Sequence, residues 1–445
     1  MMALTTFLTR AKPFLLGAAL ALASLAASAL PPGAAELLMY EQKYVNRTLD
    51  ENKIFSLQNH QAARYSPEQG QLFEVKSYWL PADRQHVFKV PSALRELGIR
   101  FERTREGQRE VLFLVHPESE SFYRDLVKNA PEGQKFLATA TASSRTLMMW
   151  PERNPEKVFF GKLSLNKEIG GVVRTIPQGE IARSVGVSQI LESARGELPR
   201  QFDFLPEFFG VMPRGMERGG MLLRSLPPEM MSGETRVMPL FAFYTRASGR
   251  STSPVEDLIR QSGLSAQNVV LEKVVRPFAR QWVELAVNHG IAIEAHAQNV
   301  LMEIDRQGMP TGKFVYRDFG GFNIDLAFRR AQGLALPGEL PVIEGESKDY
   351  HQQFHEKALR QSLETYFEGG FLFGLGQELE RLGQSSMDYK GLTQSLHDEI
   401  RRELGARGHA MKKGSFFTEL LETVQKARAA AGRRAGACGK LYLAR

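Results

Sequence analysis

A polar stretch at residues 289–321 limits what this chain can fold into, because it crowds charged and amide side chains around two predicted β-strands. Residues 300–304 and 313–317 alternate apolar and polar side chains, and the turn between them contains two glycines and a proline. This pattern is typical of a β-hairpin. We therefore predict a hairpin that holds Asn299 before its first strand and Asp318 just after its second.

The polar side chains at these strand ends are of the kinds that bind metals and phosphates. They are Glu294, His296, Gln298, Asn299 and Asp318, and an Asp-Phe-Gly-Gly turn follows the second strand. Polar groups gathered at strand ends and followed by glycines more often form a ligand site than meet a requirement of the fold. If the first four residues continue the preceding helix, Glu294 and Gln298 share one face, and His296 and Asn299 lie on another nearby.

Three short strand-like runs upstream each present hydroxyl groups and one cation. The cations are Arg145, Lys162 and Arg174, and Ser143 lies in the first run. Neighbouring strands could aim these cations into one cleft, where arginine would grip phosphate or carboxylate oxygens in a bidentate manner and lysine would act as a point charge. The alternative is that the three cations face water, and alternation alone does not separate the two.

Composition places the chain among ordinary globular proteins. It has 445 residues, enough for two or three domains, with 43% hydrophobic and 24% charged residues. The net charge of +7 is modest for this size and spread along the chain, so it fits anionic small substrates as well as nucleic acid, and we expect no nucleic-acid partner. The single cysteine, Cys438, excludes an internal disulfide framework and a thiolate metal cluster.

The N-terminus has the pattern of a secretory signal peptide. Arg10 and Lys12 precede an apolar run at 14–27, and the small residues up to Ala29 form a cleavage site. We therefore expect residues 1–29 to be a signal peptide, the protein to be exported or periplasmic, and membrane contact to occur only through this segment. An uncleaved anchor and an amphiphilic N-terminus are the alternatives.

The order of the predicted elements indicates an α+β protein with a strand-rich half followed by a helical half. A buried strand at 110–116 ends before a proline, and a further strand is predicted at 237–244. Ser253, followed by a proline and by Glu256, forms an N-terminal helix cap that marks the boundary between the halves. Beyond this cap, helical periodicity recurs to about residue 431.

Several blocks, taken in their order along the chain, resemble the IucA/IucC family of NRPS-independent siderophore (NIS) synthetases, the aerobactin-synthetase type. The blocks are LVHP at 114–117, SSRT at 143–146, KLS at 162–164, RT at 174–175, LLR at 222–224, MPL at 238–240, HGIAIEAHAQN at 289–299 and RDFGG at 317–321. Each block is weakly specific alone, but their order makes the set specific over about residues 112–330.

The resemblance implies an α+β, hand-like fold with thumb, fingers and palm. On this basis we expect a reduced, thumb-like region at 30–115, a fingers-like domain with an antiparallel sheet at 116–250, and a mostly helical, palm-like domain at 251–445 that includes the hairpin at 300–318. Enzymes of this family use ATP and magnesium to adenylate a carboxylate, typically of citrate, and couple it to an amine, hydroxylamine or alcohol. The resemblance thus implies an acid-amine ligase of siderophore biosynthesis, which serves iron acquisition.

The same resemblance assigns roles to individual residues. The phosphate and carboxylate contacts are expected at Ser143, Arg145, Lys162 and Arg174, the nucleotide and magnesium contacts at Glu294, Gln298, Asn299 and Asp318, and the residue that steadies the reacting groups at His296. Within this set, His296, Arg174 and Lys162 are the catalytic candidates, and Glu294 and Asp318 are the metal ligands. Attack of one anion on another needs such cations to neutralise both and hold them in line.

Two departures from the family pattern keep a second hypothesis open. The His-Pro-x-His-Pro block of the family has no match between Ala35 and His116, and Ser225 stands where the family usually has glutamate. With the signal peptide, these departures motivate an exported homologue that binds a carboxylate ligand or a ferric siderophore without turnover. A protein-kinase-like catalytic loop is disfavoured, because that loop has its catalytic aspartate two positions after the histidine, and here Gln298 lies two positions after His296. The oligomeric state is left open, with a homodimer as one alternative.

Overall fold

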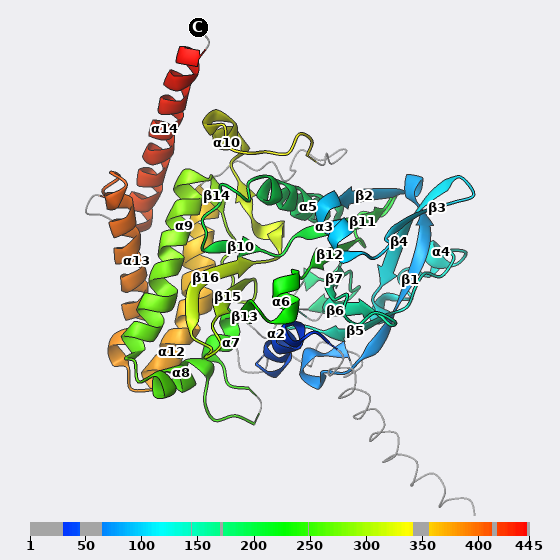
Figure 1. Ribbon diagram of the computed structural model, residues 1–445, viewed down its shortest axis with the longest axis horizontal. Coiled ribbons are helices and arrows are strands. Elements are labelled where there is room, and N and C mark those ends of the chain that lie inside the picture. Colours follow the sequence, from blue (N-terminus) through cyan, green and yellow to red (C-terminus); the bar gives the residue numbers. More distant parts are fainter. Residues whose placement is uncertain are drawn as a thin grey trace, which may run out of the picture.

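The computed structural model describes residues 30–44, 65–143, 145–169, 172–247, 249–340, 356–411 and 416–442. The signal peptide expected at 1–29 lies outside these residues. Among the helices that the structure describes, none is both long enough and apolar enough to span a bilayer. The described residues form a nine-stranded sheet, a four-stranded sheet and two two-stranded sheets, and most of the helices gather beside the four-stranded sheet (Figure 1).

The larger sheet has nine strands in the order β2-β11-β12-β7-β6-β5-β1-β4-β3, and every neighbouring pair is antiparallel. Its strands are β1 (Phe73–Pro81), β2 (Gln85–Lys89), β3 (Glu102–Arg105), β4 (Gln108–Val115), β5 (Phe136–Ala140), β6 (Thr146–Pro151), β7 (Phe159–Leu163), β11 (Glu207–Pro213) and β12 (Met221–Ser225). Helix α5 (Gln178–Ser193) packs on this sheet through Ile181 and Val185, which share one apolar cluster with Val211. The sheet fills the right half of Figure 1.

The larger sheet crosses the boundary expected between residues 115 and 116. Strand β1 pairs with β4 on one side, where Lys76 lies opposite Val115, and with β5 on the other, where Phe73 lies opposite Ala138. The expected thumb-like region and the fingers-like domain therefore share one sheet, and the division between them stays a prediction. Strand β1 has the mostly alternating burial of a half-buried strand, and this local pattern does not reveal which strands it pairs with.

The smaller sheet has four strands in the order β10-β16-β15-β13. They are β10 (Phe202–Phe204), β16 (Pro310–Tyr316), β15 (Val300–Ile304) and β13 (Arg236–Pro239). Strands β15 and β16 form the predicted antiparallel hairpin, with Val300 opposite Tyr316. Because β10 and β13 precede residue 250, the sheet joins segments from both sides of the expected second boundary.

The helical half packs against this smaller sheet, on the left of Figure 1. Its helices are α8 (Pro254–Ser262), the π-helical segment η8 (Asn268–Val275), α9 (Arg276–Asn288), α10 (Leu326–Gln332), α11 (Glu356–Arg360), the π-helical segment η10 (Gln361–Leu372), α12 (Phe373–Arg381), α13 (Tyr389–Ala406) and α14 (Phe416–Tyr442). The predicted helix start is confirmed, since the Ser253 hydroxyl accepts a hydrogen bond from the N–H of Glu256 at 3.4 Å.

The strand predicted at 237–244 is partly wrong, and the helical continuation considered for residues 294–299 does not occur. Strand β13 ends at Pro239, and the Phe-rich residues that follow form the short helix α7 (Leu240–Tyr244), buried on all sides and therefore without a readable period. Residues 294–299 are not helical, because α9 ends before Gly290, whose φ of +62° turns the chain out of the helix. The polar side chains of this segment are therefore not placed by helical spacing.

Helix α2 (Pro32–Lys43), dark blue in Figure 1, lies where the two sheets meet. Its Leu37 shares an apolar cluster with Trp150 and Phe160 of the larger sheet and with Leu301 and Val315 of the smaller one. Burial of such large apolar side chains on both sides stabilises the contact between the sheets. The N-terminal helix is therefore part of the junction that also borders the candidate site.

Candidate functional site

A cavity of about 510 Å³ opens where the end of the larger sheet faces the hairpin of the smaller one. All nine residues predicted as site residues line it: Ser143, Arg145, Lys162, Arg174, Glu294, His296, Gln298, Asn299 and Asp318. Thr146, Glu180, Arg183, Gly320 and Gly321 complete the lining. Segments that are up to 178 residues apart in the sequence thus converge on one space.

The cationic wall comes from the larger sheet. Lys162 on β7 lies opposite Thr146 on β6, and Arg145 directly precedes β6. The side chain of Lys162 is 5% exposed and that of Arg145 is 15% exposed, so neither simply faces water. The Arg145 guanidinium also donates to the carbonyl oxygen of Arg174 at 3.1 Å, which ties the third cation's backbone to the same wall. The cleft interpretation of these cations is therefore the one that the structure supports.

The opposite wall carries the acids, the amides and the histidine. Glu294 to Gln298 follow the short strand β14 (Ile291–Ala292) as extended and turn residues, and Asn299 leads into β15. Asp318 follows β16 with φ +67° and ψ +72°, a left-handed conformation that is unfavourable for a residue other than glycine. Such strain persists only where neighbours impose it, and it concentrates at functional sites.

Buried neighbours impose the Asp318 turn. The N–H of Phe319 donates to Glu207 Oε2 at 3.1 Å, and Glu207 Oε1 lies 2.5 Å from Arg224 Nη2. Glu207 is fully buried and the Arg224 side chain is 5% exposed, so the pair has little access to water. The larger sheet therefore holds the turn that presents Asp318 to the cavity.

Lys162 is the electrostatic centre of the cavity. Its Nζ lies 2.6 Å from Asp318 Oδ1 and 2.7 Å from Glu180 Oε1. Burial alone would lower the pKa of Lys162, but the two carboxylates outweigh burial and raise it. Burial likewise opposes ionisation of Asp318 and Glu180, yet Lys162 holds the pKa of both carboxyls below the ordinary range. All three groups are therefore charged near neutral pH.

Glu294 has the opposite electrostatics. Burial, reinforced by the charge of Asp318, raises its pKa to about 8, so the carboxyl is protonated near neutral pH in the ligand-free protein. Its position depends on Gly321, because a Cβ at that residue would lie 2.0 Å from Glu294 Oε2. A cation that entered the cavity would favour the ionised form of Glu294.

His296 is a neutral hydrogen-bond donor toward the cavity. Burial lowers the pKa of its imidazole, and Nδ1 accepts a hydrogen bond from the N–H of Gln298 at 3.2 Å. Since Nδ1 is an acceptor, the proton of the neutral ring is on Nε2. The Tyr366 ring, from the helical half, packs against the imidazole in a T-shaped arrangement with the ring centroids 5.9 Å apart.

Sequence reasoning missed Glu180 and Arg183, which reach the cavity from α5. They are three positions apart on the helix, so both point to the same side. Arg183 Nη1 donates to the carbonyl oxygen of Gly320 at 3.4 Å and so contacts the turn after Asp318. The available signal was an acid and an arginine at helical spacing shortly after Arg174.

The cavity fits a magnesium ion that is shared with phosphate groups. Among the described residues, no group of three or more acids, histidines or cysteines could hold a metal by itself. Magnesium usually takes one or two carboxylates and completes its shell with phosphate oxygens and water. Glu294 and Asp318, which line the same cavity, match that requirement.

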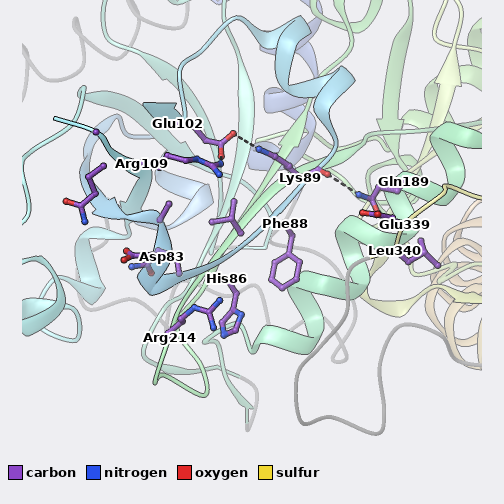
Figure 2. A pocket seen from close by; sticks show the side chains of 15 residues that line it. Asp83, His86, Phe88, Lys89, Glu102, Arg109, Gln189, Arg214, Glu339 and Leu340 are labelled. Atoms are coloured by element: carbon purple, nitrogen blue, oxygen red, sulfur yellow. Dashed lines mark hydrogen bonds and ion pairs between the residues drawn. The ribbon is translucent and has the colours of Figure 1, made fainter. Parts of the chain in front are cut away.

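A second, larger cavity of about 830 Å³ lies beside the edge strand β2. Figure 2 shows Lys89 directed at Glu102, with their charged atoms 2.8 Å apart, and Arg109 Nη2 is 3.2 Å from the same carboxylate. His86 also lines this cavity (Figure 2). Since Lys89, Glu102 and Arg109 form partly exposed ion pairs and none of the predicted site residues lines this cavity, we place the functional site in the smaller cavity.

The fold is that of siderophore synthetases. The ATP-bound aerobactin synthetase IucA from a hypervirulent pathotype of Klebsiella pneumoniae matches 86% of this chain with a TM-score of 0.57 and 17% identity, and this chain covers 72% of IucA. The petrobactin biosynthesis protein AsbB from Bacillus anthracis str. Sterne matches 80% of this chain with a TM-score of 0.59 and 16% identity, and this chain covers 63% of AsbB. Aerobactin synthetase IucC from a hypervirulent pathotype of Klebsiella pneumoniae matches 84% of this chain with a TM-score of 0.57 and 15% identity, and this chain covers 74% of IucC.

Sequence comparison gives two partial matches to family models. Residues 55–245 match the IucA / IucC family model, and residues 279–369 match the model of the ferric iron reductase FhuF-like transporter. No curated protein sequence matches the chain. The first match makes residues 55–245 similar to the IucA / IucC family, and the fold is similar to that of its solved aerobactin synthetases.

Proposed function

We propose that this protein is an ATP-dependent, siderophore synthetase-like ligase that adenylates a polycarboxylate such as citrate and condenses it with an amine, hydroxylamine or alcohol. One observation carries the proposal. The cations Arg145, Lys162 and Arg174 share a single cavity with His296 and Asp318, although they come from opposite sheets. A site of this kind suits two anionic reactants that must meet.

The cationic wall neutralises both reactants. In the proposed reaction a carboxylate oxygen attacks the α-phosphorus of ATP and pyrophosphate leaves, so negative charge must be held on both sides of the new bond. Arg145, Arg174 and Arg183 offer planar, multidentate donors for phosphate and carboxylate oxygens, and Lys162 adds a point charge. Fixed charges in a partly enclosed cavity need no reorganisation during the reaction, which is why they lower the barrier.

The acidic wall would hold the magnesium ion. Glu294 and Asp318 would bind it together with phosphate oxygens, and its charge would favour the ionised form of Glu294. Magnesium would supply charge neutralisation on the phosphates. Gln298 and Asn299 lie on the same wall and present amide groups for the nucleotide.

His296 would stabilise the reacting groups by donating its Nε2–H to an oxygen on which charge accumulates. Its lowered pKa keeps the ring neutral, and the hydrogen bond to Gln298 N–H keeps the proton on Nε2. The roles of Lys162 and Arg174 as catalytic residues follow from their positions beside this donor in the same cavity. We also keep export through residues 1–29 as a proposal, which cell fractionation and N-terminal sequencing of the mature protein would test.

The proposal is tested by carboxylate-dependent exchange of labelled pyrophosphate into ATP. We expect exchange that requires magnesium and a polycarboxylate, and a loss of about 100-fold or more in His296→Ala, as for removal of a donor that stabilises developing charge. His86→Ala is the matched control, because His86 lines the second cavity instead (Figure 2). Absence of exchange with every carboxylate in the folded wild-type protein would refute the proposal. Binding of a carboxylate or ferric siderophore that is indifferent to ATP would favour an exported binding protein.

A further inference from the structure

We propose that Glu41, on α2, is a positioning residue that fixes the two walls of the cavity relative to each other. Its carboxylate reaches both walls, one oxygen to each, although the side chain does not line the cavity. The inference rests on the proposed function for its catalytic consequence. Its structural consequence can be measured without any activity.

The contact with the cationic wall is made at the backbone. Glu41 Oε2 accepts a hydrogen bond from the N–H of Ala142 at 3.0 Å. Ala142 directly precedes Ser143, whose hydroxyl accepts a hydrogen bond from the N–H of Thr146 at 3.0 Å and so closes the turn that carries Arg145. Glu41 therefore anchors the base of the turn from which two predicted ligand-binding residues project.

The contact with the opposite wall is made through an arginine. Glu41 Oε1 lies 2.5 Å from Arg317 Nη2, and the same guanidinium donates to the carbonyl oxygen of Gln298 at 2.8 Å and 3.2 Å. The backbone N–H of Arg317 donates to the carbonyl oxygen of Asn299 at 3.0 Å. Arg317 thus joins Gln298, Asn299 and the adjacent Asp318 to the carboxylate of Glu41.

Burial shows that this bridge is not an incidental ion pair. The Glu41 side chain is 0% exposed and that of Arg317 is 4% exposed. A buried charge is unfavourable unless it is paired, so removing either charge leaves the other without compensation in an environment that excludes water. An apolar residue would fill the same position with less loss of hydration, but it could not hold both walls.

Other residues already dock α2, so Glu41 is not needed for that task. Leu37 packs in the apolar cluster between the sheets, and Glu36 forms a two-point ion pair with Arg236 at 2.5 Å and 2.8 Å. Gly33 lies so close to α6 (Pro228–Ser232) that an added Cβ would be 1.9 Å from the carbonyl oxygen of Met230. Glu36 therefore offers a matched control on the same helix, away from the cavity.

The experiment compares Glu41→Gln with Glu36→Gln in the full chain. Glutamine keeps the shape of Glu41 but removes the charge that pairs with Arg317. We expect kcat for pyrophosphate exchange to fall about 10- to 100-fold in Glu41→Gln, with smaller changes in the KM values, because misplacing reacting groups by about 1 Å costs this much. Glu36→Gln should keep the wild-type kcat at a temperature where both variants are folded. Equal kcat values in the two variants would overturn the proposal.

A second measurement separates this inference from the proposed function. Amide hydrogen exchange should accelerate in Glu41→Gln at Ala142 and in the segment of Gln298 and Asn299, and should stay at wild-type rates there in Glu36→Gln. If the wild type shows no pyrophosphate exchange, the proposed function fails while this readout still tests the bridge. Unchanged protection of both segments in Glu41→Gln would show that α2 does not position the walls.

Discussion

Replacing Lys162 with methionine tests whether one buried cation organises the cavity. The lysine side chain is 5% exposed, and its Nζ lies 2.6 Å from Asp318 and 2.7 Å from Glu180. Methionine keeps most of the volume and removes the charge. The two carboxylates would then face each other and Glu294 without a lysine between them.

The magnitude follows from these distances. At an effective dielectric constant of about 20, each pair gains about 6 kcal/mol of Coulomb energy, and the cost of burying the charges offsets much of it. Breaking a buried pair by removing one partner destabilises by about 3–5 kcal/mol. Because Asp318 and Glu180 are 26% and 25% exposed, we expect a value near the lower end, about 3 kcal/mol at pH 8.

The loss should depend on pH in a defined direction. Lys162 lowers the pKa of Asp318 and of Glu180 in the folded protein. In the wild type, the stability that these two carboxylates contribute is therefore fully present above the pKa values that they have in the unfolded chain, and it is lost as pH falls through their lower pKa values in the folded protein. In Lys162→Met both pKa values rise, and the carboxyls become protonated at mildly acidic pH. The difference in stability between wild type and variant should therefore shrink between pH 8 and pH 5.

Urea unfolding at the two pH values measures this difference. Lys89→Met is the matched control, because the Lys89 side chain is 38% exposed and its pair with Glu102 lies at the surface. Exposed pairs contribute at most about 1 kcal/mol. A Lys162→Met variant as stable as Lys89→Met at pH 8, or one whose deficit is the same at pH 5, would refute the electrostatic role given to Lys162.

Three further changes test other parts of the site. Glu294→Gln should raise the urea midpoint of the ligand-free protein at pH 8 and have little effect at pH 5. The pKa of Glu294 is about 8 in the folded protein, so as pH rises the carboxyl ionises first in the unfolded chain, and the wild type loses stability that the uncharged glutamine does not lose. Gly321→Ala should weaken MgATP binding at least about tenfold in calorimetry, since its Cβ would displace the Glu294 carboxyl. Glu207→Gln should cost about 3 kcal/mol in urea unfolding, because it leaves Arg224 buried without its counter-charge.

Local signals in the sequence were sufficient to predict much of the site. The hairpin follows from alternation and from the turn residues, and it places Asn299 and Asp318 at neighbouring strand ends. Short strands with one cation each left two possibilities for Lys162 and Arg145, a shared cleft or exposure to water, and the structure shows the cleft. These predictions depend only on residues within a few positions of each other, which is the range over which patterns carry information.

Features that depend on distant contacts were not predictable in this way. The pairing of β1 with both β4 and β5 joins the expected thumb-like and fingers-like regions in one sheet. This pairing was not predictable because strand partners leave no local pattern in the sequence. Glu41 acts through Arg317, which is 276 positions away, and Glu180 acts through Lys162, which lies on a different element 18 positions earlier. The helical continuation considered for residues 294–299 does not occur, because the positive φ of Gly290 turns the chain out of the helix.

The central claim is that this cavity activates a carboxylate by transferring AMP to it. The most direct test supplies the enzyme with MgATP, citrate labelled with ¹⁸O in its carboxylates, and hydroxylamine to capture the activated acid, and analyses the released nucleotide by mass spectrometry. We expect one ¹⁸O atom from citrate to appear in AMP, and we expect His296→Ala to release far less labelled AMP than His86→Ala. Label in inorganic phosphate, or hydroxamate formation without labelled AMP, would contradict it.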